Sequence, residues 1–453
     1  MTEREIAVVI LAAGKGTRMK SDLPKVLHAL AGRSMIGHVM ATAQALAPKR
    51  IIVVVGEGME KVAAAVAPVE TVIQNPRLGT GHAVSCAREA LCDFSGDVVV
   101  LYADTPLIEP ATLERLVSAL HDAAPEGGQN PSVSVLGFRP DDPAQYGRLV
   151  VGESGALEAI VEYREASPDQ RQIDLCNSGV MAGDAGVMFE LLQDVRNDNN
   201  KGEYYLTDVI ELARARGLAA AYAEADADEV LGVNSRAELA VGEALLQNRL
   251  RAAAMAEGAT MIDPSSVFLS WDTRLGRDVV IGPNVWFGPG VTVGDQVTIN
   301  GFCHLEGASI EDGATIGPFA RLRPAAEIGK GARVGNFVEV KKASLGAGAK
   351  ANHLSYIGDA SVGAGANIGA GTITCNYDGF NKFRTEIGEG AFIGSNTALV
   401  APVKVGDDAI VGAGSVIGKD VPDGALGLAR PKQDNRAEWA RRFRVRKQSE
   451  KES

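Results

Sequence analysis

The sequence predicts two domains of different architecture, an α/β domain and a parallel β-helix, joined by a long helix. Three observations lead to this prediction. Short aliphatic runs alternate with helical patterns over about the first 230 residues, Ser235–Glu257 has the composition of one continuous helix, and an aliphatic residue returns every six positions from Leu275 to Ile417. We therefore place the α/β domain at residues 1–234, a helical linker at 235–257, and the β-helix with a basic tail at 258–453.

The first domain contains four aliphatic runs that are typical of strands buried on both faces of a sheet, namely Ile6–Leu11, Ile51–Val55, Val98–Tyr102 and Val133–Phe138. Helical stretches such as Ala111–Leu120 lie between them. This alternation predicts βαβ crossovers, which join parallel strands. We therefore expect a mostly parallel sheet.

The linker Ser235–Glu257 is rich in Ala, Leu, Glu and Arg, lacks proline, and has one interior glycine, Gly242. These residues favour a single helix about 33 Å long, at a rise of about 1.5 Å per residue. At the other end of the second domain, the tail Arg430–Ser453 carries nine Lys and Arg residues against four Asp and Glu residues. We expect this tail to be extended or disordered at its end.

The six-residue period fits neither an amphipathic helix nor a hairpin, and it indicates the hexapeptide repeat of a parallel β-helix. We expect the aliphatic residue to point inward and the glycine after it to supply a positive φ at the turn. Small residues four places on would fill the corners: Val279, Ala314, Ala320, Ala332, Ala391, Thr397 and Ser415. The segment Thr374–Arg384 lacks the repeat, and it is either a loop on a binding side or a tolerated insertion.

Composition excludes several classes of function. The chain has 453 residues and a formal charge of −12, which argues against general nucleic-acid binding because phosphates attract a basic surface. The five cysteines are never spaced as Cys-x-x-Cys, so we expect neither disulfides nor a zinc site, and a reducing cytoplasm fits. No apolar run approaches membrane-spanning length, and the charged N-terminus does not resemble a signal peptide.

Chemistry in the first domain centres on a Gly-rich turn at Leu11–Met19, which follows the first strand. Such a turn can present backbone N–H groups to phosphates, although it matches neither the Walker A motif nor the dinucleotide fingerprint. By itself, a plain strand–helix turn is about equally plausible. Asp104 ends a buried strand, where a carboxylate is costly unless it is paired or bound to metal; the alternative is a helix N-cap before Pro106.

Chemistry in the second domain centres on residues 321–353. Seven Lys and Arg residues stand there against two acids, which indicates either an anionic ligand or a solvated strip of charge. The basic residues are Arg321, Arg323, Lys330, Arg333, Lys341, Lys342 and Lys350. His353 follows at once, and a histidine there can be a general base or a structural residue.

Taken together, Leu11–Met19 and Pro24–Leu27 resemble the sugar-nucleotide pyrophosphorylases, and motifs along the whole chain extend the resemblance. These motifs are Gln74, Gly79–Ala83, Tyr102–Asp104, Tyr146–Arg148, Val161–Glu162, Asn177–Gly179, Gly202–Asp208, Gly232–Asn234, Phe319–Pro324, Gly335–Lys342, His353–Asp359, Gly369–Gly379 and Gly394–Ser395. Except for its extreme termini, the chain resembles the family of bacterial bifunctional N-acetylglucosamine-1-phosphate uridylyltransferases/glucosamine-1-phosphate N-acetyltransferases. Ala103, Ser178 and Asn352 depart from the expected pattern without removing a functional group.

For the first half, the resemblance implies a Rossmann-like nucleotidyltransferase domain that joins N-acetylglucosamine 1-phosphate to UTP and releases pyrophosphate. Mg²⁺ would be held by Asp104 and Asn234, and phosphate charge would be neutralised by Arg18 and Lys25. The residues implied to bind nucleotide or sugar are Leu11, Ala12, Ala13, Gly14, Arg18, Lys25, Gln74, Gly79, Thr80, Tyr102, Ala103, Asp104, Gly147, Glu162, Asn177 and Asn234.

For the second half, the resemblance implies a left-handed β-helix that acetylates glucosamine 1-phosphate with acetyl-CoA, with His353 as the base. Arg323, Lys341, Tyr356 and Asn367 would hold the amino-sugar phosphate, and Ala370, Asn376, Tyr377, Ser395, Ala413 and Arg430 would contact acetyl-CoA. The resemblance also implies a homotrimer with sites between neighbouring prisms. The product, UDP-N-acetylglucosamine, would feed peptidoglycan and lipopolysaccharide synthesis.

Two other interpretations stay open at this point. The chain could be a pyrophosphorylase for another sugar with a β-helix that only regulates or oligomerises, but such a protein needs neither His353 nor the loop Thr374–Arg384. It could also be a non-catalytic scaffold, which would tolerate the loss of Lys25, Asp104 or Asn234, and all three are present.

Overall fold

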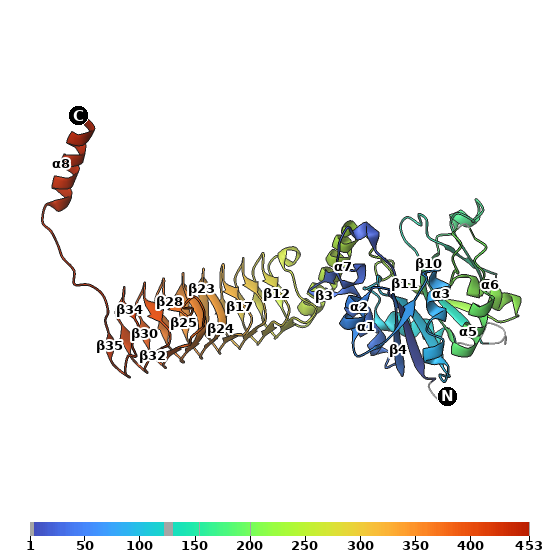
Figure 1. Ribbon diagram of the computed structural model, residues 1–453, viewed down its shortest axis with the longest axis horizontal. Coiled ribbons are helices and arrows are strands. Elements are labelled where there is room, and N and C mark those ends of the chain that lie inside the picture. Colours follow the sequence, from blue (N-terminus) through green and yellow to red (C-terminus); the bar gives the residue numbers. More distant parts are fainter. Residues whose placement is uncertain (1–3, 122–129, 154, 200, 453) are drawn as a thin grey trace. The chain divides into compact units, whose positions relative to one another are not determined.

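The structure is a computed structural model that describes residues 4–121, 130–153, 155–199 and 201–452. The chain forms two compact units, Met1–Leu250 and Arg251–Ser453, and each is described by itself (Figure 1). Among the described residues, no helix is long and apolar enough to cross a membrane.

The first unit is built on a mixed sheet whose main path has seven strands, and along this path every neighbouring pair is parallel except the two made by β10. The strands lie in the order β11 (Ala220–Ala225), β7 (Val133–Phe138), β10 (Cys176–Asp184), β6 (Asp97–Tyr102), β1 (Ile6–Leu11), β4 (Arg50–Gly56) and β5 (Glu70–Gln74). β8 (Arg148–Val151) and β9 (Leu157–Val161) form an antiparallel pair, and β8 joins the sheet at the start of β10, where Arg148 pairs with Cys176. The expected mostly parallel sheet is confirmed.

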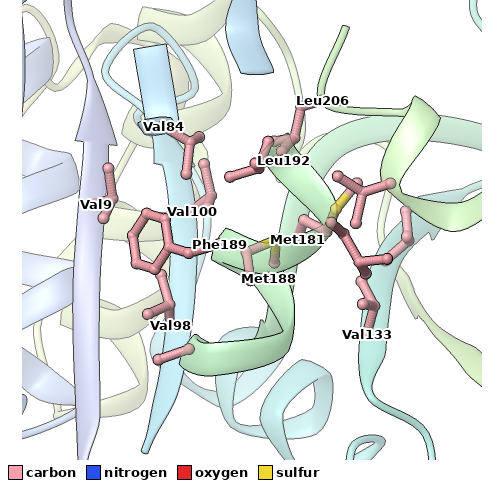
Figure 2. Packing of buried hydrophobic residues seen from close by; sticks show 14 of the residues in the cluster. Val9, Val84, Val98, Val100, Val133, Met181, Met188, Phe189, Leu192 and Leu206 are labelled. Carbon is pink, nitrogen blue, oxygen red and sulfur yellow. The ribbon is translucent and has the colours of Figure 1, made fainter. Parts of the chain in front are cut away.

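Helices cover both faces of this sheet. They are α1 (Met35–Ala45), α2 (Glu60–Val66), α3 (Thr80–Ser85), α4 (Pro110–Ser118), α5 (Ala185–Asp194) and α6 (Asp208–Ala215), with 3₁₀ turns at Thr17–Met19, Lys25–Leu27, Glu89–Leu91 and Gln170–Gln172. Successive residues of a strand point to opposite faces, so Val9 belongs to one apolar cluster and Val8 to the other. Figure 2 shows Phe189 of α5 packed beside Val9, Val98 and Val100. Burial on both faces explains the continuous aliphatic runs.

A long helix, α7 (Arg236–Ala256), follows the sheet and agrees within one residue at each end with the expected helix. Its first turns belong to the α/β unit: Glu243 accepts a hydrogen bond from Ala31 N at 2.7 Å, and Arg249 donates one to Leu107 O at 2.6 Å. The chain passes from one unit to the next between Leu250 and Arg251, inside α7. The boundaries of the functional domains stay a prediction.

The second unit is a parallel β-helix with three columns of short strands. One column contains β12 (Thr260–Met261), β14 (Val280–Ile281), β17 (Thr298–Ile299), β20 (Thr315–Ile316), β23 (Arg333–Asn336), β25 (Lys350–His353), β27 (Asn367–Ile368), β30 (Phe392–Ile393), β33 (Ile410–Val411) and β35 (Leu426–Gly427). The second contains β13 (Arg274–Leu275), β16 (Thr292–Val293), β19 (Ala308–Ile310), β22 (Ala326–Ile328), β29 (Thr385–Ile387) and β32 (Val403–Val405). The third contains β15 (Trp286–Phe287), β18 (His304–Leu305), β21 (Arg321–Leu322), β28 (Ile373–Cys375), β31 (Ala398–Val400) and β34 (Val416–Ile417), while β24 (Glu339–Leu345) and β26 (Tyr356–Val362) each span the second and third columns.

The register confirms the hexapeptide period. Val280 pairs with Thr298 and Thr298 with Thr315, so one coil takes eighteen and the next seventeen residues, about three six-residue steps. Asn367 pairs with Phe392, twenty-five residues on, because that coil carries the insertion between β28 and β29. The small residues expected at the corners are all buried.

The expected role of the glycine after each aliphatic residue is wrong. Among these glycines in the described chain, only Gly317 has a positive φ, of 81°. Glycine is needed because consecutive coils approach closely: a Cβ at Gly335 would lie 2.0 Å from Asn352 O, and one at Gly363 would lie 2.4 Å from Glu389 N. Positive φ occurs about two residues further on, as at Gly331.

The expectation of an extended or disordered tail is also wrong, because Trp439–Glu452 forms a helix, α8. The segment has good helix formers in Ala, Arg, Lys, Gln and Glu, and ion pairs one turn apart support it. Lys447 lies 2.6 Å from Glu450, and the rings of Trp439 and Phe443 stack with centroids 5.1 Å apart. The high charge of this segment led us to expect an extended chain. Opposite charges one helical turn apart instead support a helix.

Candidate functional sites

The α/β unit contains a cavity of about 260 Å³ at the carboxyl ends of its central strands. Ten of the predicted nucleotide-binding residues line it: Leu11, Ala12, Ala13, Gly14, Lys25, Gln74, Gly79, Thr80, Tyr102 and Asp104. They come from the ends of β1, β5 and β6 and from the turns that follow. Crevices at this edge of an open α/β sheet commonly bind ligands.

Two oxygen atoms converge on one cation beside this cavity. The Lys25 ammonium donates a hydrogen bond to Asp104 Oδ2 and another, 2.8 Å long, to Asn234 Oδ1. The Asp104 carboxylate therefore pairs with a lysine and does not cap a helix. Glu109 precedes α4 instead.

The donor set of this pair fits a magnesium ion. Mg²⁺ takes oxygen ligands and is usually bound through one or two protein groups, with water and substrate phosphates completing its octahedron. Asp104 and Asn234 supply two oxygens aimed at a single cation, and the Lys25 ammonium satisfies both. Within the described part of the chain, no group of three or more His, Cys, Asp or Glu residues could hold a metal by itself.

Two glycines allow the turns around the cavity to come close to other segments. Gly16 has a φ of 62°, and a Cβ there would lie 2.4 Å from Lys25 Cβ. Gly79 has a φ of 100°, and a Cβ there would lie 2.6 Å from Tyr204 O. A side chain at either position would displace Lys25 or the segment at Tyr204, respectively.

Arg77 and Glu203 also line the cavity, and sequence reasoning did not name them as site residues. Arg77 Nε donates to Ala13 O at 2.7 Å and its Nη2 donates to Glu57 O at 3.2 Å, so this side chain ties the first turn to the end of β4. Gly56 leaves room for it, because a Cβ there would lie 2.0 Å from Arg77 Nη2. The position of Arg77 between Gln74 and Gly79 was the available signal.

A second group of predicted residues lies on the neighbouring strands β8 to β10. Asn177 N donates to Gly147 O at 2.8 Å, and a Cβ at Gly147 would lie 3.6 Å from Glu162 Oε1. Burial raises the pKa of Glu162, with a smaller opposing effect from Lys201. The Tyr102 ring connects this group with the cavity, because it lies about 3.0 Å from where a Cβ of Gly179 would be.

Arg18 and Ala103, which were also predicted to bind nucleotide or sugar, do not line the cavity. Arg18 is exposed in the 3₁₀ turn Thr17–Met19 and does not line the cavity. Ala103 is buried, and its backbone N donates to Leu11 O at 3.1 Å. Ala103 therefore holds β6 against β1.

In the β-helix, predicted phosphate-binding residues lie on successive coils. The register of β21 and β24 places Arg323 beside Lys341, since Leu322 pairs with Val340 and Arg323 N donates to Val340 O at 2.9 Å. Lys341 pairs with Gly358 on the next coil. The Tyr356 hydroxyl lies over Gly358, where a Cβ would come within 2.3 Å of it. Arg323, Lys341 and Tyr356 are thus brought together.

Two charged residues that sequence reasoning did not assign complete this cluster. Glu339 accepts a hydrogen bond from Arg323 at 2.8 Å, and Arg321 lies 3.8 Å from its other oxygen. The charge of Arg323 and, next, that of Lys382 lower the pKa of Lys341. Lys382 belongs to the insertion between β28 and β29, so this loop brings a third cation to the same place. A group of adjacent cations favours the binding of an anionic ligand.

His353 starts a column at one corner of the prism. The pairing of Ala351 with Ile368, Ile368 with Ile393 and Ile393 with Val411 sets the register of the residues two places on, which are His353, Ala370, Ser395 and Ala413. Hydrogen bonds follow this column: Asn396 N donates to Ala370 O at 2.7 Å, and Gly414 N donates to Ser395 O at 2.8 Å. The exposed His353 therefore adjoins three predicted acetyl-CoA residues in a line.

The remaining predicted residues surround this column at different places. Arg430 Nη1 donates to Ala413 O at 2.9 Å, and Asn376 Nδ2 donates to Asp359 Oδ2 at 2.5 Å, which ties the insertion to β26. Tyr377 is exposed, with its hydroxyl on Gly379 O. Asn367 lies on the column of β25 and β27, a different face from Tyr356. Within the described part of the chain, no hydrogen bond joins these two side chains.

Comparisons with known proteins agree with this division. Residues 8–170 match the model of the MobA-like NTP transferase domain, and residues 307–342 and 384–419 match that of the bacterial transferase hexapeptide. The fold and the two sites therefore define a chain with two transferase domains, a Rossmann-like nucleotidyltransferase and a left-handed β-helix of the hexapeptide class.

Full-length relatives identify the family. The chain is 62% identical to the bifunctional protein GlmU of Paramagnetospirillum magneticum over 100% of its own length and 99% of that protein. It is 62% identical to that of Rhodospirillum rubrum and 53% to that of Zymomonas mobilis, with 97% and 98% of each chain covered. The chain belongs to the family of bifunctional GlmU proteins and is an enzyme with two transferase domains.

Proposed function

We propose that this protein makes UDP-N-acetylglucosamine in two steps, acetylation of glucosamine 1-phosphate followed by transfer of UMP from UTP. The observation that carries the proposal is the presence of both sites in one chain. One is a cavity with two oxygens aimed at a single cation, and the other is a basic cluster beside an exposed histidine.

In the first site, an oxygen of the sugar phosphate attacks the α-phosphorus of UTP, and the bond to pyrophosphate breaks. The turn Leu11–Gly14 presents backbone groups to the nucleotide, and Lys25 neutralises phosphate charge. Asp104 and Asn234 would hold magnesium, which would stabilise the negative charge on the phosphates. Gly147, Glu162 and Asn177 bind the sugar, and Arg18 adds charge at the mouth.

In the second site, His353 accepts a proton from the ammonium group of glucosamine 1-phosphate. The amine nitrogen then attacks the thioester carbon of acetyl-CoA, the carbon–sulfur bond breaks, and a second proton passes from the nitrogen to the sulfur, so that CoA leaves as a thiol. Arg323, Lys341 and Lys382 hold the phosphate, and Tyr356 and Asn367 position the sugar. The column Ala370, Ser395 and Ala413, with Asn376, Tyr377 and Arg430, holds acetyl-CoA.

We place the second site between neighbouring copies of the chain. Tyr356 and Asn367 lie on different faces of a single prism, and His353 stands at an exposed corner. A homotrimer of parallel prisms, with each site between neighbours, brings such faces together. We assign uridylyl transfer to residues 1–234, the link to 235–257, and acetyl transfer to 258–453. We also place the protein in the cytoplasm, in keeping with these substrates.

A single assay tests the proposal. Purified protein is incubated with glucosamine 1-phosphate, acetyl-CoA, UTP and Mg²⁺, and products are separated by mass. We expect UDP-N-acetylglucosamine, pyrophosphate and CoA in equal amounts. Omission of Mg²⁺ should leave N-acetylglucosamine 1-phosphate as the end product. Failure to release CoA would contradict the acetyltransferase half, and formation of a different nucleotide sugar would contradict the substrate.

A further inference from the structure

The imidazole of His353 is held by a residue from the preceding coil. Asn336 and His353 are register partners in β23 and β25, seventeen positions apart. His353 Nδ1 lies 2.7 Å from Asn336 Oδ1. An amide oxygen only accepts hydrogen bonds, so Nδ1 must carry the proton in this arrangement. The lone pair of the neutral ring is then on Nε2.

Hydrogen bonds also fix the backbone around His353, which restricts the position of the imidazole ring. Leu354 N donates to Asn336 O at 3.0 Å, which makes a second link between the same two segments. On the other side, the buried Ser355 hydroxyl donates to His353 O at 2.9 Å, and Gly371 N donates to it at 3.3 Å. Ser355 and Gly371 hold the backbone of His353, whereas Asn336 contacts the imidazole ring itself.

We propose that Asn336 is a positioning residue for acetyl transfer, which fixes the Nδ1–H tautomer of His353 so that Nε2 is the atom that takes the proton. The inference rests on the proposed role of His353 as the base. Free histidine prefers to carry its proton on Nε2, and the hydrogen bond at the other nitrogen decides which tautomer is present. In that other tautomer Nε2 has no lone pair, and the base would be absent from this atom.

The position of Asn336 in the coil supports a specific role. Residues at its place in the three preceding coils are Pro283, Gly301 and Pro318, none of which has a hydrogen-bonding side chain. The turn after the strand therefore does not itself require an amide. Asparagine appears where its oxygen reaches the histidine.

The tautomer is tested directly by ¹⁵N NMR of the full-length protein labelled at histidine, at a pH where His353 is neutral. We expect the His353 signals of the wild type to show a protonated Nδ1, and those of Asn336→Leu to show a protonated Nε2. His353→Ala identifies the signals. A protonated Nε2 in the wild type would overturn the inference, whether or not any variant folds.

Kinetics test the consequence. Asn336→Leu should lower kcat for acetyl transfer by about 10-fold to 100-fold, the range expected when a catalytic group is slightly misplaced. KM for both substrates and the rate of uridylyl transfer should change by less than about twofold. Asn336→Asp keeps an acceptor oxygen and should restore most of the rate. An unchanged kcat in a stable Asn336→Leu protein would also overturn the inference.

Asn300→Leu is the matched control. Asn300 lies two coils earlier in the same column, and its amide donates to Ile316 O at 3.2 Å and to Gly317 O at 3.3 Å. Its replacement removes hydrogen bonds of the prism without touching His353, so it should lower the melting temperature and leave kcat unchanged. The base assignment is checked separately: full acetylation by His353→Ala would refute the proposed function, whereas the tautomer of the wild type tests Asn336 alone.

Discussion

The two units build ligand sites in opposite ways. The α/β unit gathers loops from the ends of several strands around a cavity, and one copy of the chain contains all the groups that surround it. The β-helix places its groups on outer corners and faces, where successive coils repeat the same position after seventeen or eighteen residues, or after twenty-five in the coil with the insertion. The first arrangement encloses a ligand, and the second lines it up along a column.

The same difference affects charge. In the α/β unit the Lys25 ammonium is buried and has two oxygen partners, Asp104 and Asn234. On the prism, Arg323 and Lys382 both lower the pKa of Lys341, which is a cost that a bound phosphate would relieve. A site whose charged groups are paired in the absence of ligand can be complete within one chain. A site with like charges side by side is completed by the ligand, or by a neighbouring copy.

The largest expected effect comes from removal of the whole prism. A protein consisting of residues 1–257 should keep uridylyl transfer, since every residue of the cavity and Asn234 lie before α7. It should lose acetylation completely. Light scattering should show a smaller assembly than that of the full-length chain, because the prism is the proposed contact between copies. A fragment that still forms the full-length assembly would place the interface in the α/β unit.

Asp104→Ala should reduce uridylyl transfer by about 10³-fold or more, because loss of a metal ligand removes several kcal/mol of charge stabilisation on the phosphates. Acetylation should persist, since attack on a thioester needs no metal here. The two rates are measured on the same preparation. Asp93→Ala, which removes an exposed carboxylate paired with Arg50, is the matched control and should retain both activities. A variant with full UDP-sugar formation would refute the role of Asp104.

His353→Ala should lower acetyl transfer by about 10² to 10⁴, the usual contribution of a general base. Uridylyl transfer, binding of acetyl-CoA and the melting temperature should be nearly unchanged, because the side chain is exposed at a corner. The matched control is His304→Ala, a histidine of the same prism whose ring lies 4.2 Å from that of Trp286, centroid to centroid, at an angle of 53°. If His353 were structural, the variant would lose thermal stability together with activity.

Lys382→Met should raise KM for glucosamine 1-phosphate by about tenfold, the effect of losing one charge-assisted hydrogen bond of about 1.5 kcal/mol. kcat should change little if the lysine only holds the phosphate. Lys330→Met is the control, since this exposed lysine lies 3.9 Å from Asp312 and belongs to a different turn. An equal rise in KM for both variants would mean that the whole basic strip acts through its general field, and that Lys382 has no specific contact.

Local patterns in the sequence were sufficient for much of the fold. The strands β1 and β7 begin and end where the aliphatic runs do, because burial on both faces demands such runs. The coils follow the six-residue period for the same reason. The glycines were misinterpreted because their cause is not local: Gly335 is required by Asn352 O, an atom one coil away.

The site residues show the same limit. Ten of the residues predicted by resemblance line one cavity, and their binding roles stay predictions, while Arg77 and Lys382 were not predicted. Arg77 donates a hydrogen bond to Ala13, and the charge of Lys382 lowers the pKa of Lys341. The two residues of each pair are far apart in the sequence. The contact of Asn336 with His353 could have been inferred, because seventeen residues is the length of one coil.

The smallest expected effect concerns stability, and it also separates the two units. Coils from Arg274 onward fully bury neutral hydroxyl and amide groups such as Ser355, Thr374 and Asn376, whereas the α/β unit also fully buries charged groups such as Lys25 and Asp97. Burial, followed by the charges of Glu211, Glu165 and Glu162, raises the pKa of Asp208 from 3.8 to about 6. Dependence of unfolding on pH should therefore lie mainly in the α/β unit.

Asp208→Asn should reveal this dependence. Because the folded-state pKa exceeds the unfolded value, the folded protein holds the proton more tightly, and ionisation of Asp208 destabilises it. The destabilisation is absent below about pH 4, grows up to about pH 6, and stays constant above that. After allowance for partial exposure, Asp208→Asn should raise the melting temperature of the α/β unit by about 2–4 °C at pH 8, as about 1 kcal/mol would in a domain of this size. Calorimetry should show no gain at pH 4, and Asp169→Asn, at an exposed carboxylate, should show none at either pH. A gain at both pH values would mean that Asp208 affects stability through packing, with no part for its charge.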